Sequence, residues 1–113
     1  VEVAYTKDGK SHVIEADRCL VAVSVQPNTE NLGLEEAGVV LERGYVKVDE
    51  RMATSVPGIW AIGDVTAVMP FTHVAKYQGR IAADAILGRP RPASYVGIPR
   101  VVFADPEIAA AGL

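Results

Sequence analysis

The chain has 113 residues, half of them apolar, and its formal net charge is −3. This length and composition fit one modest globular domain, and the mildly acidic balance gives no reason to expect nucleic acid as a partner. No apolar run is long enough to cross a membrane, so no membrane partner is expected. The single cysteine, Cys19, excludes an internal disulfide and suits a cytoplasmic location.

The first predicted element is a β-hairpin at the start of the chain. Residues 1–5 and 12–16 are both strand-like runs of mostly apolar side chains, and Asp8-Gly9 lies between them. Asp-Gly between two strand-like runs is a strong signal for a tight hairpin turn. We expect His12 to face solvent from one arm of this hairpin.

A buried strand is predicted next. Residues 19–25 form a near-continuous apolar run rich in valine, which is typical of a strand covered on both faces. Pro27 ends the run because proline has no N–H to donate to a neighbouring strand. Since Cys19 begins this run and has no second cysteine beside it, we expect its thiol to be an inert core group.

A second, shorter hairpin is predicted around Arg43-Gly44. β-like runs at residues 39–41 and 45–48 flank this pair, whose glycine readily takes the positive φ of a tight turn.

The string T-S-V-P-G-I-W-A-I-G-D, residues 54–64, is the most informative part of the sequence. Its Pro-Gly pair predicts a turn, and residues 59–62 predict a short buried parallel strand. Gly63 then leaves room for a ligand to approach the backbone. Asp64 places a carboxylate at the carboxyl end of that strand, which is where open α/β sheets bind their ligands.

A loop over residues 65–70 and a helix over residues 72–87 are predicted after this string. Thr72 is the expected N-cap, and Gly88 with the prolines that follow it ends the helix and begins a linker. The apolar face consists of Val74, Ile81, Ala82, Ala85 and Ile86. Gly79 costs a helix roughly 1 kcal/mol relative to alanine, so we expect close packing to require it.

The string at residues 54–64 resembles the second flavin-contacting motif of the FAD-dependent pyridine nucleotide–disulfide oxidoreductases. Residues 17–22, 27–29 and 32–39 are also similar to stretches of that family. The resemblance implies that FAD is bound and that Asp64 accepts a hydrogen bond from a ribityl hydroxyl of FAD. From the residues alone, an aspartate that caps its own turn through the backbone is the alternative.

The same resemblance implies a second contact with the flavin, at the start of the predicted helix. The helix opening at Phe71, Thr72 and His73 would direct its free N–H groups towards the N1/C2 carbonyl edge of the flavin ring. Gly63 and Asp64, together with these three residues, are the expected cofactor-binding residues. We expect backbone amides to make this second contact, and the His73 side chain to make a structural hydrogen bond. No catalytic residue and no metal-ligand set is expected in this chain.

The fold class implied by the resemblance is α/β, as a fragment of a flavoprotein with two dinucleotide-binding domains. Residues 1–27 would be the C-terminal strands of the NAD(P)-binding domain. Residues 28–92 would be the C-terminal half of the FAD-binding domain, and residues 93–113 the start of an α+β interface domain. A first residue that is not Met also favours a piece of a longer polypeptide. We expect residues 1–25 and 98–113 to pack poorly on the middle segment, which leaves their edges open to another chain.

The function implied is that of an FAD-dependent NAD(P)H:disulfide oxidoreductase, most similar to the dihydrolipoamide dehydrogenases and active as a homodimer. These 113 residues contain neither a G-x-G-x-x-G fingerprint nor a cysteine pair, so the chain alone is not expected to be catalytic. The alternatives are a mercuric reductase, a soluble transhydrogenase-like member, or a flavoprotein of the ferredoxin- or nitrite-reductase group. A standalone binding or interaction module is the alternative outside the enzymes.

The sequence departs from the family pattern in one place. Ser24-Val25 stands where most members carry Gly-Arg. Serine restricts the backbone more than glycine does, and valine removes a fixed cation. Contacts that the family makes through this arginine are therefore in doubt for this chain.

Overall fold

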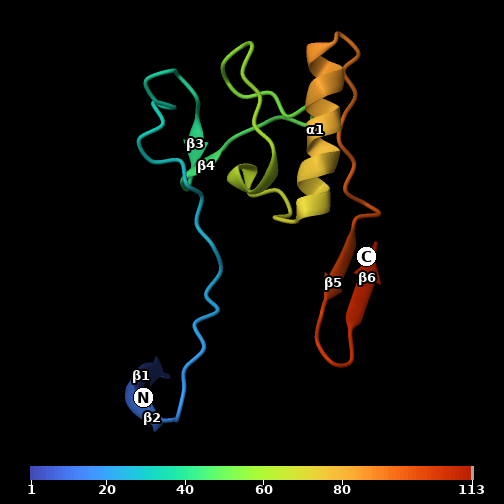
Figure 1. Ribbon diagram of the computed structural model, residues 1–113. Helices are drawn as coiled ribbons and strands as arrows, with labels where there is room; N and C mark the ends of the chain where they lie inside the picture. The colour runs from blue at the N-terminus through green and yellow to red at the C-terminus, as the bar shows by residue number, and fades with distance from the viewer. Residues whose placement is uncertain (113) are drawn as a thin grey trace.

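The computed structural model describes residues 1–112, which form three small antiparallel sheets, one α-helix and one 3₁₀ helix (Figure 1). The elements in chain order are β1 (Glu2–Lys7), β2 (Lys10–Glu15), β3 (Leu41–Glu42), β4 (Tyr45–Val46), η1 (Gly63–Thr66), α1 (Thr72–Ile86), β5 (Pro99–Val102) and β6 (Ile108–Ala111). The α/β class is confirmed. No helix within residues 1–112 has the length and apolar character that crossing a membrane requires.

Both predicted hairpins form. β1 pairs with β2 in the register Glu2↔Glu15 to Lys7↔Lys10, and β3 pairs with β4 around Arg43-Gly44. The two turn residues have positive φ in each case, 51° and 72° at Asp8-Gly9, and 54° and 83° at Arg43-Gly44. A two-residue turn with positive φ at both positions matches the twist of the strands that it joins. His12 is exposed, as predicted, and stacks on Tyr5 with 5.2 Å between ring centroids.

The predicted strand at residues 19–25 is wrong. These residues run without a strand partner among residues 1–112, as the light-blue stretch of Figure 1 shows. Leu20 is 90% exposed and Val23 is 83% exposed, and Cys19 is exposed instead of lying in a core. The reason is physical: a strand buried on both faces needs neighbours that pair with it and cover it, and the contact of this run with β4 is limited to its last residue, Val25.

The predicted buried strand at residues 59–62 is also wrong. The segment makes a single antiparallel bridge, between Trp60 and Ala53, and Ile59 and Ile62 are 37% and 42% exposed. A single bridge pairs the backbone groups of this segment on one side only, and the pairing is antiparallel, so the segment is not part of a parallel sheet. The turn before it is confirmed, because Gly58 has a φ of 87° and Ile59 N donates to the carbonyl oxygen of Val56.

The predicted helix is confirmed as α1, which is the centre of the only hydrophobic cluster in the described residues. Ile81 and Ala82 of α1 pack with Met52, and four further apolar side chains surround them: Val48, Trp60, Tyr77 and Ala93. The predicted N-cap, Thr72, is wrong. Phe71 is the N-cap, because its backbone is still extended while its carbonyl oxygen already accepts from Ala75 N at 3.0 Å.

The C-terminal end of α1 closes as predicted at Gly88. This residue has a φ of 73° and donates to the carbonyl oxygen of Ala85, while Arg89 N donates to that of Asp84 at 2.8 Å. These two bonds form a Schellman motif, which favours glycine at the position with positive φ. The following segment then runs back along the helix, where Ser94 N donates to Tyr77 Oη at 2.9 Å.

The two ends of the chain do not share a core with the middle segment. Every residue of β1, β2, β5 and β6 is exposed. Figure 1 shows β1–β2 far from α1, while β5–β6 extends from the N-terminal end of α1, where the Pro99 carbonyl oxygen meets His73. The radius of gyration is 19.1 Å, against about 13 Å for a compact domain of about 100 residues. The expectation that both ends pack poorly is therefore confirmed for residues 1–25 and 98–112. Leu113 lies outside the described residues.

Candidate cofactor-binding site

The turn at Gly63-Asp64 is held between β4 and α1. Its backbone leaves the extended conformation of Ile62 and turns at Gly63, where φ is 78°. Gly63 is buried, and a Cβ atom at this position would lie 3.3 Å from the Cβ of Ala75 in α1. On the side where a Cβ would lie, α1 comes close to the Gly63 backbone, and the approach of a ligand to this backbone stays a prediction. Glycine is needed here for the positive φ and for the approach of the helix.

The Asp64 carboxylate is exposed, and it accepts no hydrogen bond from any residue that the structure describes. Asp49 shows what a turn-capping aspartate does in this chain, because its Oδ1 accepts from Arg51 N at 2.8 Å and from Ala53 N at 2.9 Å. No such bond ties Asp64 to its own turn. Its side chain is therefore available to a ligand.

Asp64 borders an open cavity of about 310 Å³. The lining residues come from the segment before β3, from β4 and from η1: Val25, Gln26, Pro27, Asn28, Tyr45, Asp64 and Val65. Tyr45 Oη donates to the carbonyl oxygen of Val25 at 3.3 Å, which holds the two walls together. The structure thus places Asp64 and Val25, one of the two residues that depart from the family pattern, around the same cavity. Ser24 itself has a φ of 83°, in the region that glycine tolerates best.

The start of α1 presents backbone N–H groups. The first bond of the helix runs from Ala75 N to the carbonyl oxygen of Phe71, so the N–H groups of Thr72, His73 and Val74 have no acceptor within the helix. Phe71 and His73 stack, with 5.4 Å between ring centroids. His73 Nε2 lies 2.8 Å from the carbonyl oxygen of Pro99, so the predicted structural hydrogen bond of this side chain is confirmed. The backbone of this first turn, with its positive partial charge, is the part suited to an electron-rich group.

Sequence reasoning missed Gln78, which has no exposed surface. Its Oε1 accepts from Gly63 N at 2.6 Å, directly beside Asp64. The signal that could have found it is its position on α1, four residues after Val74 and three before Ile81, where a polar side chain interrupts the apolar face. A buried amide in such a place needs polar partners, so its presence predicts a hydrogen-bond network.

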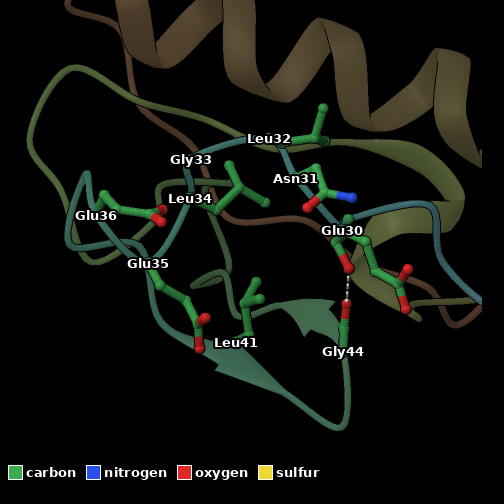
Figure 2. Close-up of a pocket in the computed structure, with 10 residues that line it drawn as sticks. Glu30, Asn31, Leu32, Gly33, Leu34, Glu35, Glu36, Leu41 and Gly44 are labelled. Atoms are coloured by element: carbon green, nitrogen blue, oxygen red, sulfur yellow. Dashed lines mark hydrogen bonds between the residues drawn. The ribbon is translucent and has the colours of Figure 1, made fainter.

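A separate cavity of about 310 Å³ lies in the loop before β3 (Figure 2). Glu30, Glu35 and Glu36 border it, and Thr29 Oγ1 donates to the carbonyl oxygen of Gly44 at 2.6 Å, which fixes the loop to the β3–β4 turn. No group of His, Cys, Asp and Glu side chains within residues 1–112 is arranged to hold a metal ion.

One ion pair perturbs a titrating group at the far end of α1. The Arg91 guanidinium donates from Nε to Asp84 Oδ2 at 2.7 Å, and this hydrogen bond lowers the pKa of the Asp84 carboxyl. The pair joins the end of α1 to the linker and lies outside the Asp64 cavity.

Comparisons with known proteins agree on one family. The sequence model described as pyridine nucleotide-disulphide oxidoreductase matches residues 1–79. Dihydrolipoyl dehydrogenases of Geobacillus stearothermophilus and Bacillus subtilis are 47% and 45% identical over 99% of this chain, which covers 24% of each relative.

Two solved structures are also similar to this chain. LpdA from Mycobacterium tuberculosis has a TM-score of 0.80 at 40% identity, over 94% of this chain and 23% of its own. RclA from Escherichia coli, an HOCl-induced flavoprotein disulfide reductase, has a TM-score of 0.79 at 34% identity, over 99% of this chain and 26% of its own. The chain thus spans about a quarter of the length of the relatives that it matches.

Proposed function

Because this chain belongs to the pyridine nucleotide-disulphide oxidoreductase family, we propose that it forms part of the FAD site of a longer oxidoreductase. The observation that carries the proposal is the exposed Asp64 carboxylate, which accepts no hydrogen bond within residues 1–112. A ribityl hydroxyl of FAD is a neutral donor, and an ionised carboxylate accepts from it in a charge-assisted hydrogen bond.

The other residues of the site fit the flavin as well. The backbone of Phe71, Thr72 and His73 opens α1 with N–H groups that can meet a carbonyl edge of the flavin ring. Gly63 shapes the turn that presents Asp64. FAD, when bound, would supply the flavin ring that accepts a hydride from a nicotinamide nucleotide and then passes on the two electrons. The residues of this chain hold and orient it.

The proposed domain assignment divides the chain into three parts. Residues 1–27 end the NAD(P)-binding domain, residues 28–92 are the returning half of the FAD-binding domain, and residues 93–113 begin the interface domain. The lack of a core shared by β1–β2, the middle segment and β5–β6 supports a division into three parts, although Ala93 and Tyr95 at the start of the third part pack on the middle segment. Each hairpin would find its covering partners in the rest of its own domain.

The whole protein is proposed to be a dihydrolipoamide dehydrogenase-like enzyme that uses FAD and NAD(P) in the cytoplasm. The identities of 47% and 45% to dihydrolipoyl dehydrogenases support this choice over other members of the family. A homodimer is proposed because β5–β6 exposes large apolar side chains, namely Val101, Val102, Phe103 and Ile108.

The test of the flavin site is Asp64→Ala in the full-length protein. Loss of a charge-assisted hydrogen bond worth roughly 1.5–3 kcal/mol should raise the dissociation constant for FAD by about one to two orders of magnitude. Asp64→Asn should do less harm, because an amide oxygen still accepts. Fluorescence titration of the deflavinated protein with FAD measures both variants.

Asp49→Ala is the matched control. It removes an aspartate that caps a turn in the same segment, so it should lower stability and leave the affinity for FAD unchanged. Equal affinity of the wild type and Asp64→Ala for FAD would show that the Asp64 carboxylate does not hold the flavin.

A further inference from the structure

Gln78 joins three separate segments of the chain from inside the core. Besides accepting from Gly63 N at 2.6 Å, its amide donates from Nε2 to the carbonyl oxygen of Val68 at 3.4 Å and to Tyr95 Oη at 3.1 Å. The partners fix the orientation of the amide, because a backbone N–H can only donate and a backbone carbonyl can only accept. The amide oxygen of Gln78 therefore faces Gly63, and its amide nitrogen faces Val68 and Tyr95.

The bond to Gly63 ties the proposed flavin turn to helix α1. The other side-chain bond to Gly63 comes from Thr66 Oγ1, which donates to the Gly63 carbonyl oxygen at 2.8 Å. Thr66 belongs to η1 itself, so this bond moves with the turn. Gln78 belongs to α1, so its bond sets where the turn lies relative to the helix. Without Gln78, the buried Gly63 N–H would lose the side-chain acceptor that it has.

Tyr95 supports Gln78 from the segment that follows α1. Its hydroxyl accepts from Gln78 Nε2 and lies 3.9 Å from Met52 Sδ, to which it donates. Tyr95 also meets Tyr77 edge to face, with 6.1 Å between ring centroids. Tyr95 thus ties the Gln78 amide to the linker that follows α1.

We propose that Gln78 is a positioning residue, supported by Tyr95, that holds the Asp64 carboxylate at a fixed place relative to the N-terminus of α1. This inference rests on the proposed function, because Asp64 and the start of α1 are the two parts of the proposed flavin site. A protein can contact two groups of one ligand at the same time only when the distance between the two contacting protein groups matches the ligand and is held fixed.

Gln78→Met in the full-length FAD-loaded protein is the main test. Methionine fills a similar volume but offers no useful acceptor to Gly63 N. The dissociation constant for FAD should rise roughly fivefold to tenfold, and the visible circular dichroism of the bound flavin should change because Asp64 is displaced. Gln78→Glu keeps an acceptor facing Gly63 N, so its affinity for FAD should lie between those of the wild type and Gln78→Met.

Two tyrosine variants separate positioning from general stability. Tyr95→Phe removes the hydroxyl that accepts from Gln78 Nε2, and it should weaken FAD binding in the same direction as Gln78→Met. Tyr77→Phe is the matched control, because its hydroxyl also joins α1 to the linker, through Ser94 N, but has no bond to Gln78. It should lower the melting temperature of the apoprotein and leave both FAD affinity and the flavin spectrum unchanged.

The outcomes test the positioning role of Gln78 separately from the proposed flavin site at Asp64. If Gln78→Met and Tyr77→Phe weaken FAD binding equally, or if Gln78→Met binds FAD as the wild type does, Gln78 has no positioning role. If Gln78→Met does not fold, Tyr95→Phe against Tyr77→Phe makes the same comparison. A wild type that does not bind FAD, or that is unaffected by Asp64→Ala, overturns the proposed function and this inference with it. Loss of binding in Asp64→Ala alone overturns only the inference.

Discussion

At the scale of single residues, Gly63 is subject to two separate requirements. Its φ of 78° is a conformation that costs other residues about 1–2 kcal/mol, and its missing side chain admits Ala75 of α1. Gly58 in the same segment has a φ of 87°, but no atom of the described residues lies within 4 Å of where its Cβ would be. The two glycines therefore differ only in the second requirement.

Gly63→Ala should destabilise the chain more than Gly58→Ala does. Gly58→Ala should lower the free energy of unfolding by about 1–2 kcal/mol, because alanine is strained at positive φ. Gly63→Ala should lower it by the same amount and by about 1–3 kcal/mol more, because its Cβ is packed tightly against Ala75. Urea unfolding of both variants measures the difference. Equal losses would mean that α1 moves aside freely and that the turn is not packed against it.

At the scale of elements, the parts that were predicted correctly are those that depend on neighbours in sequence. Asp8-Gly9 forms its hairpin turn and Gly88 ends α1, because positive φ at these positions is a local property. Residues 19–25 and 59–62 were wrong because a strand forms only when remote segments pair with it. A local pattern cannot report whether those segments are present.

The same distinction applies to the site. Asp64 was predicted from its surrounding string, and the structure adds that no described residue occupies its carboxylate. Gln78 was missed because its three partners, Gly63, Val68 and Tyr95, come together only in the folded chain. In the helical periodicity, Gln78 is only a polar residue that interrupts an apolar face, and nothing in the pattern shows that it is the centre of a hydrogen-bond network.

Helix α1 gives a direct test of the prediction that close packing requires Gly79. A Cβ at Gly79 would lie 3.5 Å from Ile62 Cδ1, which is ordinary van der Waals contact. Gly79→Ala should therefore stabilise the chain by about 0.5–1 kcal/mol through helix propensity. Thermal unfolding measures the gain, with the exposed neighbour Arg80→Ala as a control that should change little. A loss of stability in Gly79→Ala would restore the packing explanation.

At the scale of the whole molecule, the described chain is one small core with a hairpin at each end. An isolated two-stranded hairpin is marginally stable in water, and every residue of β1 and β2 is exposed. Amide hydrogen exchange should therefore be on the order of 100-fold or more slower in the buried turns of α1, at Gln78 and Ile81, than in β1–β2. Similar protection in both regions would mean that the hairpin packs on the core.

The exposed run at residues 19–25 has a consequence for handling the chain in solution. The run is uncharged, rich in valine and free of proline, and Leu20, Val21 and Val23 are at least 75% exposed. Segments of this composition can nucleate amyloid-like fibrils. Arg18 and Pro27, which flank the run, are residue types that oppose such aggregation. These seven residues should therefore promote association of the chain, and one lysine within them should raise the concentration at which the chain stays monomeric.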